Sequence, residues 1–349
     1  MKVSILLPYK EDYSKENAGA VSIFVSGINK YSRYRRSTKV YGNTNYKNFL
    51  SKNYVNIPFK KIFLQSSSKI YVKNFIDLEK QRKSKIIEIH NRPSYLNYFT
   101  NLQKRKFVIY FHNDPLTMSG SVTIKERLFI LNFCDKIIFN SEWTRKRFLT
   151  NLEKFYQNSE KIQVICQSTT KVKVDLMKKD KVIIFVGKLN KSKGYDIFGK
   201  AILKILNKHN NWNAIVYGDE PRENISFKHK NLKILGFKKH YEILDKLKTT
   251  SISVVCSRWE EPFGRTAMEA SSRGCAVIIS NRGGLPEAAS HPIKLKSFDH
   301  EALFKAIDKL IMNKKYRTLI QKKTHDKFVL TNKLISRKLD DYRKKLIKF

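Results

Sequence analysis

The chain has 349 residues, of which 41% are hydrophobic and 12% aromatic, so it is long enough and apolar enough for two domains with buried cores and is not a disordered polymer. Its formal net charge of +40, from 70 Lys and Arg against 30 Asp and Glu, predicts attraction to polyanions such as nucleic acid or an anionic membrane. The joint richness in Lys, Asn, Ile, Phe and Tyr is also typical of an AT-rich genome, and we attribute much of the charge to that bias.

The four cysteines form no Cys-x-x-Cys pair and lie among apolar residues, which predicts buried free thiols in a reducing compartment. No apolar run approaches the roughly 18 residues of a membrane span, and the apolar start of the chain is too short for a signal peptide. We therefore expect a cytoplasmic protein. Basic segments with aromatic residues nearby, at 30–36 and 104–106, are either solvated faces or patches for peripheral membrane docking.

In chain order, residues 3–7 form a predicted strand, followed by a polar loop, Gly19 and a helix to about residue 31. Strands are then predicted at 85–89, 107–111, 136–139 and 161–165, with helices at 124–133 and 143–152 between them. This alternation indicates a doubly wound parallel sheet, whose ligands gather at the carboxyl ends of the strands. Two polar clusters stand at such ends: one contains His90 and Arg92, the other His112 and Asn113. Each could instead be a structural loop.

A polar, lysine-rich stretch at 170–180 is the predicted linker to a second domain. A strand at 181–186 then leads into a loop that reads GKLNKSKG and carries Lys188 and Lys193. Further strands are predicted at 213–217, 232–235 and 252–256, the second of them ending at Gly236 and Phe237, with a helix at 242–248. The chain ends in helices at 301–312 and 316–328 and a basic amphipathic helix at 333–348.

The most informative stretch lies at 257–287, where Glu261 and Glu269 stand eight positions apart. A Pro-Phe-Gly turn with Gly264 separates them and leads into a predicted helix at 266–272. The free N–H groups at the start of a helix suit a phosphate, and the two glutamates suit hydroxyl groups such as those of a ribose and a sugar. This pattern is what a nucleotide sugar requires. Either glutamate alone could equally be a solvated acid.

Taken together, these motifs resemble the E-x7-E segment and glycine-lysine loop of retaining glycosyltransferases of the GT-B fold, specifically glycosyltransferase family 4 (glycosyl transferases group 1). The resemblance implies an α/β protein with two Rossmann-like doubly wound domains facing a central cleft. We expect an acceptor-binding domain at 1–172, a nucleotide-sugar-binding domain at 173–332, and a C-terminal helix at 333–349 that packs back toward the first domain.

The resemblance also implies roles for individual residues. The catalytic group would comprise His112, Glu261 and Lys193, and the acceptor would contact His90, Arg92 and Asn113. Lysine replaces the family's usual arginine at Lys188, and Arg265 replaces an aliphatic residue. The donor-binding residues would be Gly19, Lys188, Lys193, Phe237, Glu261, Phe263, Gly264, Arg265, Thr266 and Glu269.

The expected reaction transfers a hexosyl group from a nucleotide diphosphate sugar to a hydroxyl of a lipid-linked or surface-glycan acceptor, as in lipopolysaccharide biosynthesis, with retention of configuration. We expect no cofactor and no metal, because the sequence has no convincing D-x-D motif and the two lysines can neutralise the diphosphate. An anionic membrane surface is a further expected partner. The alternatives are a nucleotide-sugar epimerase on the same fold or, from another class, a basic nucleic-acid-binding protein, although the sequence has no recognisable nucleic-acid module.

Overall fold

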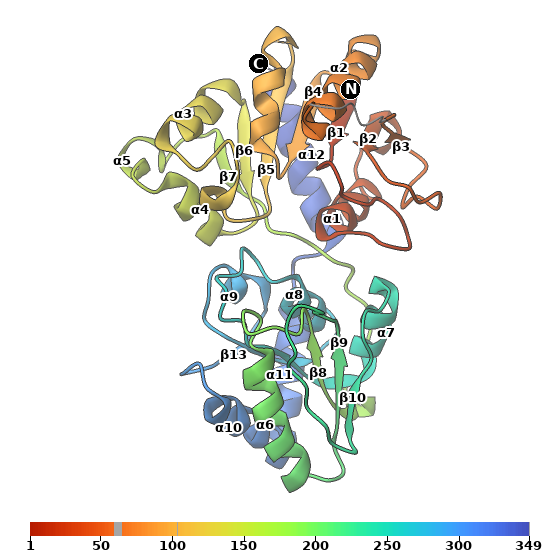
Figure 1. The fold of residues 1–349 in the computed structure, drawn as a ribbon, viewed down its shortest axis with the longest axis vertical. Coiled ribbons are helices and arrows are strands. Elements are labelled where there is room, and N and C mark those ends of the chain that lie inside the picture. Colours follow the sequence, from red (N-terminus) through yellow and green to blue (C-terminus); the bar gives the residue numbers. More distant parts are fainter. Residues whose placement is uncertain (59–64, 103, 349) are drawn as a thin grey trace. The chain divides into compact units, whose positions relative to one another are not determined.

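The computed structural model describes residues 1–58, 65–102 and 104–348, and these fold into two compact units. Unit 1 comprises residues 1–168 and 332–349, and unit 2 comprises residues 169–331. Both units are layered α/β structures built on a parallel sheet (Figure 1). The prediction of two doubly wound parallel sheets is therefore confirmed.

Unit 1 has a seven-stranded sheet with the order β3-β2-β1-β4-β5-β6-β7, in which every neighbouring pair is parallel. Its strands are β1 (Val3–Leu6), β2 (Thr38–Gly42), β3 (Tyr54–Asn56), β4 (Ile86–His90), β5 (Lys106–Phe111), β6 (Lys136–Phe139) and β7 (Ile162–Val164). Its helices are α1 (Ala20–Asn29), α2 (Ser67–Arg82), α3 (Ile124–Phe133), α4 (Glu142–Leu149), α5 (Glu153–Tyr156) and α12 (Asn332–Lys348).

Unit 2 has a six-stranded parallel sheet with the order β10-β9-β8-β11-β12-β13. Its strands are β8 (Asp180–Val186), β9 (Asn213–Tyr217), β10 (Leu232–Ile234), β11 (Thr250–Val255), β12 (Ala276–Ile279) and β13 (Ile293–Lys294). Its helices are α6 (Tyr195–Lys208), α7 (His240–Thr249), α8 (Arg265–Ser271), α9 (Leu285–Ala288), α10 (His300–Met312) and α11 (Lys314–Asp326).

The strands are apolar runs because helices cover both faces of each sheet. The central strands β1 and β4 of unit 1 are buried along their whole length, as is β12 of unit 2. Cys134, Cys256 and Cys275 are buried thiols within these cores, as predicted. Among the described residues, no helix is both long enough and apolar enough to cross a bilayer.

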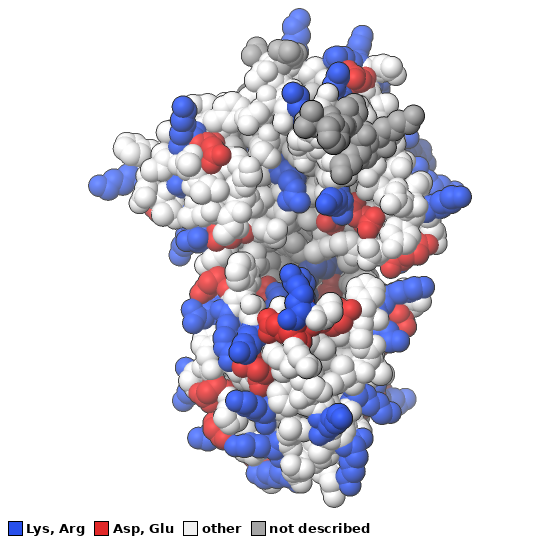
Figure 2. Space-filling model, in the orientation of Figure 1, with Lys and Arg blue, Asp and Glu red and all other residues white. Residues whose placement is uncertain are grey.

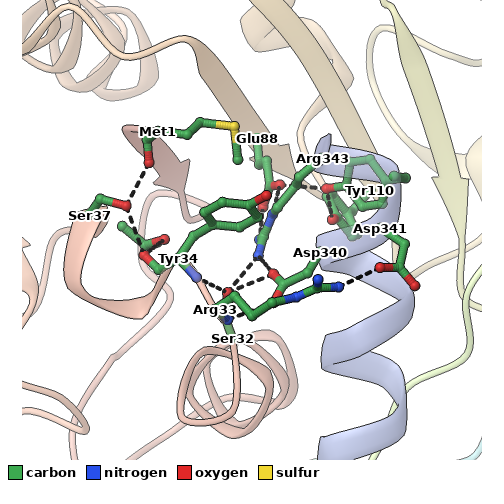
Figure 3. A network of polar contacts seen from close by, with 12 residues as sticks. Met1, Ser32, Arg33, Tyr34, Ser37, Glu88, Tyr110, Asp340, Asp341 and Arg343 are labelled. Carbon is green, nitrogen blue, oxygen red and sulfur yellow. Dashed lines mark hydrogen bonds and ion pairs between the residues drawn. The ribbon is translucent and has the colours of Figure 1, made fainter. Parts of the chain in front are cut away.

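The last helix, α12, belongs to unit 1 and is joined to its sheet by a buried ion pair (Figure 3). The guanidinium of Arg343 donates two hydrogen bonds of 2.7 Å to the carboxylate of Glu88 on β4. One turn earlier, Asp340 accepts hydrogen bonds from Ser32 Oγ (2.7 Å) and the backbone N–H of Arg33 (2.6 Å), just beyond α1. The basic helix α12 is therefore held in unit 1 by paired charges as well as by its buried apolar residues Ile335 and Leu339.

Candidate active site

The loop that joins β8 to α6 is fastened to the chain that follows β11. The carbonyl oxygen of Ser192 in this loop accepts a hydrogen bond of 2.8 Å from the backbone N–H of Arg258. Gly194 ends the loop with φ of +73°, and a β-carbon there would lie 2.0 Å from the carbonyl oxygen of Cys256. This position therefore requires glycine, and the close approach brings Lys193 to the segment with the two glutamates.

Lys193 and Glu261, which sequence analysis placed in one site, are in direct contact. The Lys193 Nζ lies 2.6 Å from Glu261 Oε1, and the two side chains are 32% and 12% exposed. The Gly-Gly loop after β12 holds the backbone of Glu261, because Gly284 donates a hydrogen bond of 2.6 Å to its carbonyl oxygen. Gly283 has φ of +57°, and a β-carbon there would lie 2.2 Å from that same oxygen. Glu261 is thus held twice: Lys193 contacts its carboxylate, and the Gly-Gly loop binds its backbone.

Glu269, on α8, is a buried carboxylate with two close partners. Its Oε1 lies 2.7 Å from Arg265 Nη2 and 2.8 Å from His240 Nε2. Burial by itself would raise the pKa of Glu269, but the charges of Arg265 and His240 outweigh it and lower the pKa to about 2. This carboxylate is therefore ionised at neutral pH and can accept hydrogen bonds.

Lys188 follows β8 and shares a carboxylate with a second cation. Its Nζ lies 4.0 Å from Glu220 Oε2, and the lysine side chain is 62% exposed. Arg222 forms two hydrogen bonds of 2.7 and 2.9 Å to the same carboxylate. These hydrogen bonds, with the charge of Arg222, lower the pKa of Glu220 to about 2. Lys188 thus reaches solvent at the carboxyl end of its strand, where a phosphate could meet it.

The other predicted donor-binding residues of unit 2 differ in exposure. The side chain of Phe237 is 64% exposed just beyond β10, whereas Phe263 is 2% exposed. Gly264 has φ of +108°, and a β-carbon there would lie 2.3 Å from the Leu285 side chain, so glycine is required. Thr266 is half-buried in the first turn of α8. A ligand can therefore meet Phe237, whereas Phe263 is buried and does not offer the surface that the predicted donor contact needs.

In unit 1, the two histidines at strand ends form a buried pair. His90 Nδ1 lies 2.9 Å from His112 Nε2, and His112 Nδ1 lies 3.3 Å from the side-chain amide of Gln167. The ring of His90 also stacks on Tyr110, with ring centroids 4.2 Å apart. Burial, and then the charge of Arg343, lower the pKa of His90 to about 3, so the imidazole is neutral. The two ring nitrogens of His112 therefore contact His90 and Gln167, both of which belong to unit 1.

This burial changes the expectation for His90. We expected His90, Arg92 and Asn113 to contact an acceptor, but His90 has no exposed surface and instead supports His112. Arg92 is half-buried and donates to the carbonyl oxygen of Asn91, while Asn113 is exposed. Arg92 and Asn113 thus keep the surface access that an acceptor contact needs.

The structure also argues against the expected diphosphate contact at Gly19. The residue precedes α1, and a β-carbon there would lie 2.3 Å from Oε1 of Glu11. That carboxylate accepts a hydrogen bond of 2.9 Å from the backbone N–H of Ser22, and burial raises its pKa. A carboxylate already occupies the start of this helix, and it would repel a phosphate in its ionised form.

Four contributors were missed by sequence analysis: His240, Glu220, Arg222 and Glu11. Each is a single polar residue in or beside a loop. Three of them act through residues elsewhere in the chain (His240 on Glu269, Glu220 on Lys188, Glu11 on Ser22), whereas Arg222 pairs locally with Glu220. The predicted start of α7 at residue 242 also excluded His240, which is its first residue. Across the described parts of the chain, no group of three or more His, Cys, Asp or Glu is arranged to hold a metal ion.

Residues 167–327, nearly all of unit 2, match the family model described as "Glycosyl transferases group 1". An uncharacterized glycosyltransferase of Methanocaldococcus jannaschii is 34% identical over 121 residues, which are 33% of this chain and 30% of that protein. The matched region thus spans about a third of this curated relative. The family similarity therefore concerns unit 2.

Solved structures show the same fold over nearly the whole chain. HepE of Anabaena in complex with UDP has a TM-score of 0.78, with 16% identity over 99% of this chain and 100% of that one. WaaG, a glycosyltransferase involved in lipopolysaccharide biosynthesis, has a TM-score of 0.67, with 14% identity over 97% and 99%. A putative UDP-N-acetylglucosamine 2-epimerase from Listeria monocytogenes has a TM-score of 0.69, with 11% identity over 100% and 97%. At these identities the similarity establishes the GT-B fold alone.

Proposed function

We propose that this protein is a retaining hexosyltransferase that uses a nucleotide diphosphate sugar as donor. The observation that carries the proposal is the direct contact between Lys193 and Glu261, in the loops at the carboxyl ends of β8 and β11, inside the segment that matches the glycosyltransferase family. Ligands of parallel α/β sheets bind at this edge.

In the proposed complex, Lys193 binds the donor diphosphate. Its ammonium group has three N–H donors, so it can keep its contact with Glu261 and still donate to phosphate oxygens. Lys188 would add a second positive charge from the same loop. As the bond to the sugar breaks, both cations would stabilise the charge that develops on the leaving nucleoside diphosphate.

The two glutamates would accept hydrogen bonds from hydroxyl groups of the donor. Glu269 is ionised and buried, which suits a carboxylate that accepts hydrogen bonds from the ribose. Glu261, held by the Gly-Gly loop, would contact the donor sugar. Phe237, which is exposed beyond β10, would lie beside the nucleotide base.

For the chemical step we propose same-face attack by the acceptor hydroxyl, assisted by the leaving phosphate. A double displacement would need a carboxylate nucleophile at the sugar, and we assign none. The two lysines would take over the charge neutralisation that a divalent metal provides elsewhere, so we propose a metal-independent reaction without a cofactor. We also propose a catalytic role for His112, whose ring is held by His90.

The acceptor would bind unit 1, where Arg92 and Asn113 retain surface access. We propose a lipid-linked or surface-glycan acceptor and a cytoplasmic protein that associates peripherally with an anionic membrane, because the net charge is +40. On the face seen in Figure 2, Lys and Arg side chains are spread over both units and interspersed with Asp and Glu. This spread favours weak attraction to a surface over a dedicated nucleic-acid site.

An epimerase is the second candidate, because the fold is shared with a putative UDP-N-acetylglucosamine 2-epimerase. The deciding experiment begins with a thermal-shift panel of UDP-, GDP- and ADP-sugars on the intact protein. The sugar that stabilises it is then incubated with and without candidate glycan acceptors. A transferase releases the nucleoside diphosphate in step with a new glycoside, whereas an epimerase converts the sugar without an acceptor. If none of the nucleotide sugars in the panel stabilised the protein, the proposed function would be refuted.

A further inference from the structure

His240 reaches Glu269 from a different helix than the one that carries the glutamate. It is the first residue of α7, and its Nε2 lies 2.8 Å from Glu269 Oε1. Arg265, one turn before Glu269 on α8, places Nη2 2.7 Å from the same oxygen. Two cationic or hydrogen-donating groups from two elements therefore converge on one oxygen of one buried carboxylate.

The two contacts restrict the carboxylate in different ways. Arg265 moves with α8, so its contact supplies charge but ties the glutamate only to its own helix. The contact with His240 ties the glutamate to α7, and rotation of the carboxylate would break both contacts. With Oε1 fixed at two points, the direction of the second oxygen is fixed as well. A carboxylate must be held in this way to distinguish ligands by their hydroxyl groups.

His240 is not needed to begin the helix on which it stands. The start of α7 is capped through Glu242, whose carboxylate accepts a hydrogen bond of 2.9 Å from the backbone N–H of Lys239. The His240 side chain is 30% exposed, so it is not part of the fully buried core. Its contact with Glu269 is therefore separable from the folding of α7.

We propose that His240 is a positioning residue for donor recognition. It holds Glu269 so that the second carboxylate oxygen accepts hydrogen bonds from the ribose hydroxyls, and it thereby sets the preference for ribonucleotides over 2′-deoxyribonucleotides. This inference rests on the proposed function, since it requires a nucleotide diphosphate in unit 2. In a neutral imidazole the Nε2 must carry the hydrogen to donate to the carboxylate.

The test measures the affinities of UDP and 2′-deoxy-UDP by isothermal titration calorimetry. The proteins are the wild type, His240→Ala, His240→Gln and the control Tyr241→Ala, which removes the neighbouring, exposed side chain of α7. If UDP does not bind, the pairs GDP with 2′-deoxy-GDP and ADP with 2′-deoxy-ADP take its place. The wild type should prefer the ribonucleotide by about tenfold or more, the worth of a hydrogen bond to a charged group.

We expect His240→Ala to reduce this preference severalfold, mainly through weaker binding of the ribonucleotide. His240→Gln, whose amide can still donate to the carboxylate, should restore part of it, and Tyr241→Ala should leave it unchanged. Should His240→Ala not fold, as judged by its circular dichroism melting curve, the preference of His240→Gln decides, and it must lie below that of the wild type.

An unchanged ratio in the histidine variants, with normal binding of the ribonucleotide, would overturn this inference and leave the proposed function standing. If the wild type bound none of the three ribonucleotides, the proposed function would fail and this inference with it. A loss of affinity for both nucleotides to the same extent would mean that His240 supports the fold of the site but does not orient Glu269. That outcome too would overturn the inference.

Discussion

The buried pair of Arg343 and Glu88 gives a sharp test of how α12 is held in unit 1. In Arg343→Met the carboxylate of Glu88, which has no exposed surface, loses two hydrogen bonds of 2.7 Å and its counter-ion. Breaking a buried ion pair from one side costs about 3–5 kcal/mol, because it leaves an uncompensated charge. That cost is a large fraction of the roughly 5–15 kcal/mol by which a typical domain is stable.

The assay is urea denaturation followed by circular dichroism, on the wild type, Arg343→Met and the double variant Arg343→Met/Glu88→Gln. The double variant should recover part of the loss, because the carboxylate of Glu88 is gone while the buried Asp340, which Arg343 also contacts at 3.1 Å, remains. The control is Lys80→Met on α2, whose ion pair with Asp77 is exposed on both sides and should be worth less than about 1 kcal/mol. A loss in Arg343→Met no larger than that of the control would refute this reasoning.

Other predictions concern unit 2. Gly283→Ala places a methyl group 2.2 Å from the carbonyl oxygen of Glu261, at φ of +57°, so thermal denaturation should show a lower Tm and donor titration a weaker affinity. The pKa of Glu269 is depressed to about 2, so its ionisation stabilises the fold above its unfolded pKa near 4.5. As the pH falls toward 2, about 3 kcal/mol should be lost; equal acid sensitivity in Glu269→Gln would contradict this. Lys193→Ala should depress turnover far more than Tm in a steady-state assay, and near-normal turnover would exclude its diphosphate role. Turnover should also persist in EDTA, and a requirement for added Mg²⁺ or Mn²⁺ would disprove metal independence.

Much of the architecture could be predicted from the sequence because parallel strands buried on both faces are short apolar runs. The predicted strand at 136–139 matches β6, and the prediction at 213–217 matches β9. The edge strand β3, its neighbour β2 and the helix α2 were not predicted. The two strands mix polar and aromatic residues, and the pairing of β2 with β1 and of β3 with β2 is settled by the sheet and not by local pattern.

The candidate site divides in the same way. The sequence by itself determined the chemistry of the 257–287 segment, because glycines, carboxylates and lysines at fixed spacing can be recognised without a fold. Only the tertiary structure decided that Lys193 pairs with Glu261, that His90 is buried, and that Glu11 occupies the start of α1. Contacts of this kind join residues that several elements separate. The order of the strands and the close packing of side chains determine these contacts. Neither can be deduced from the spacing of residues along the chain.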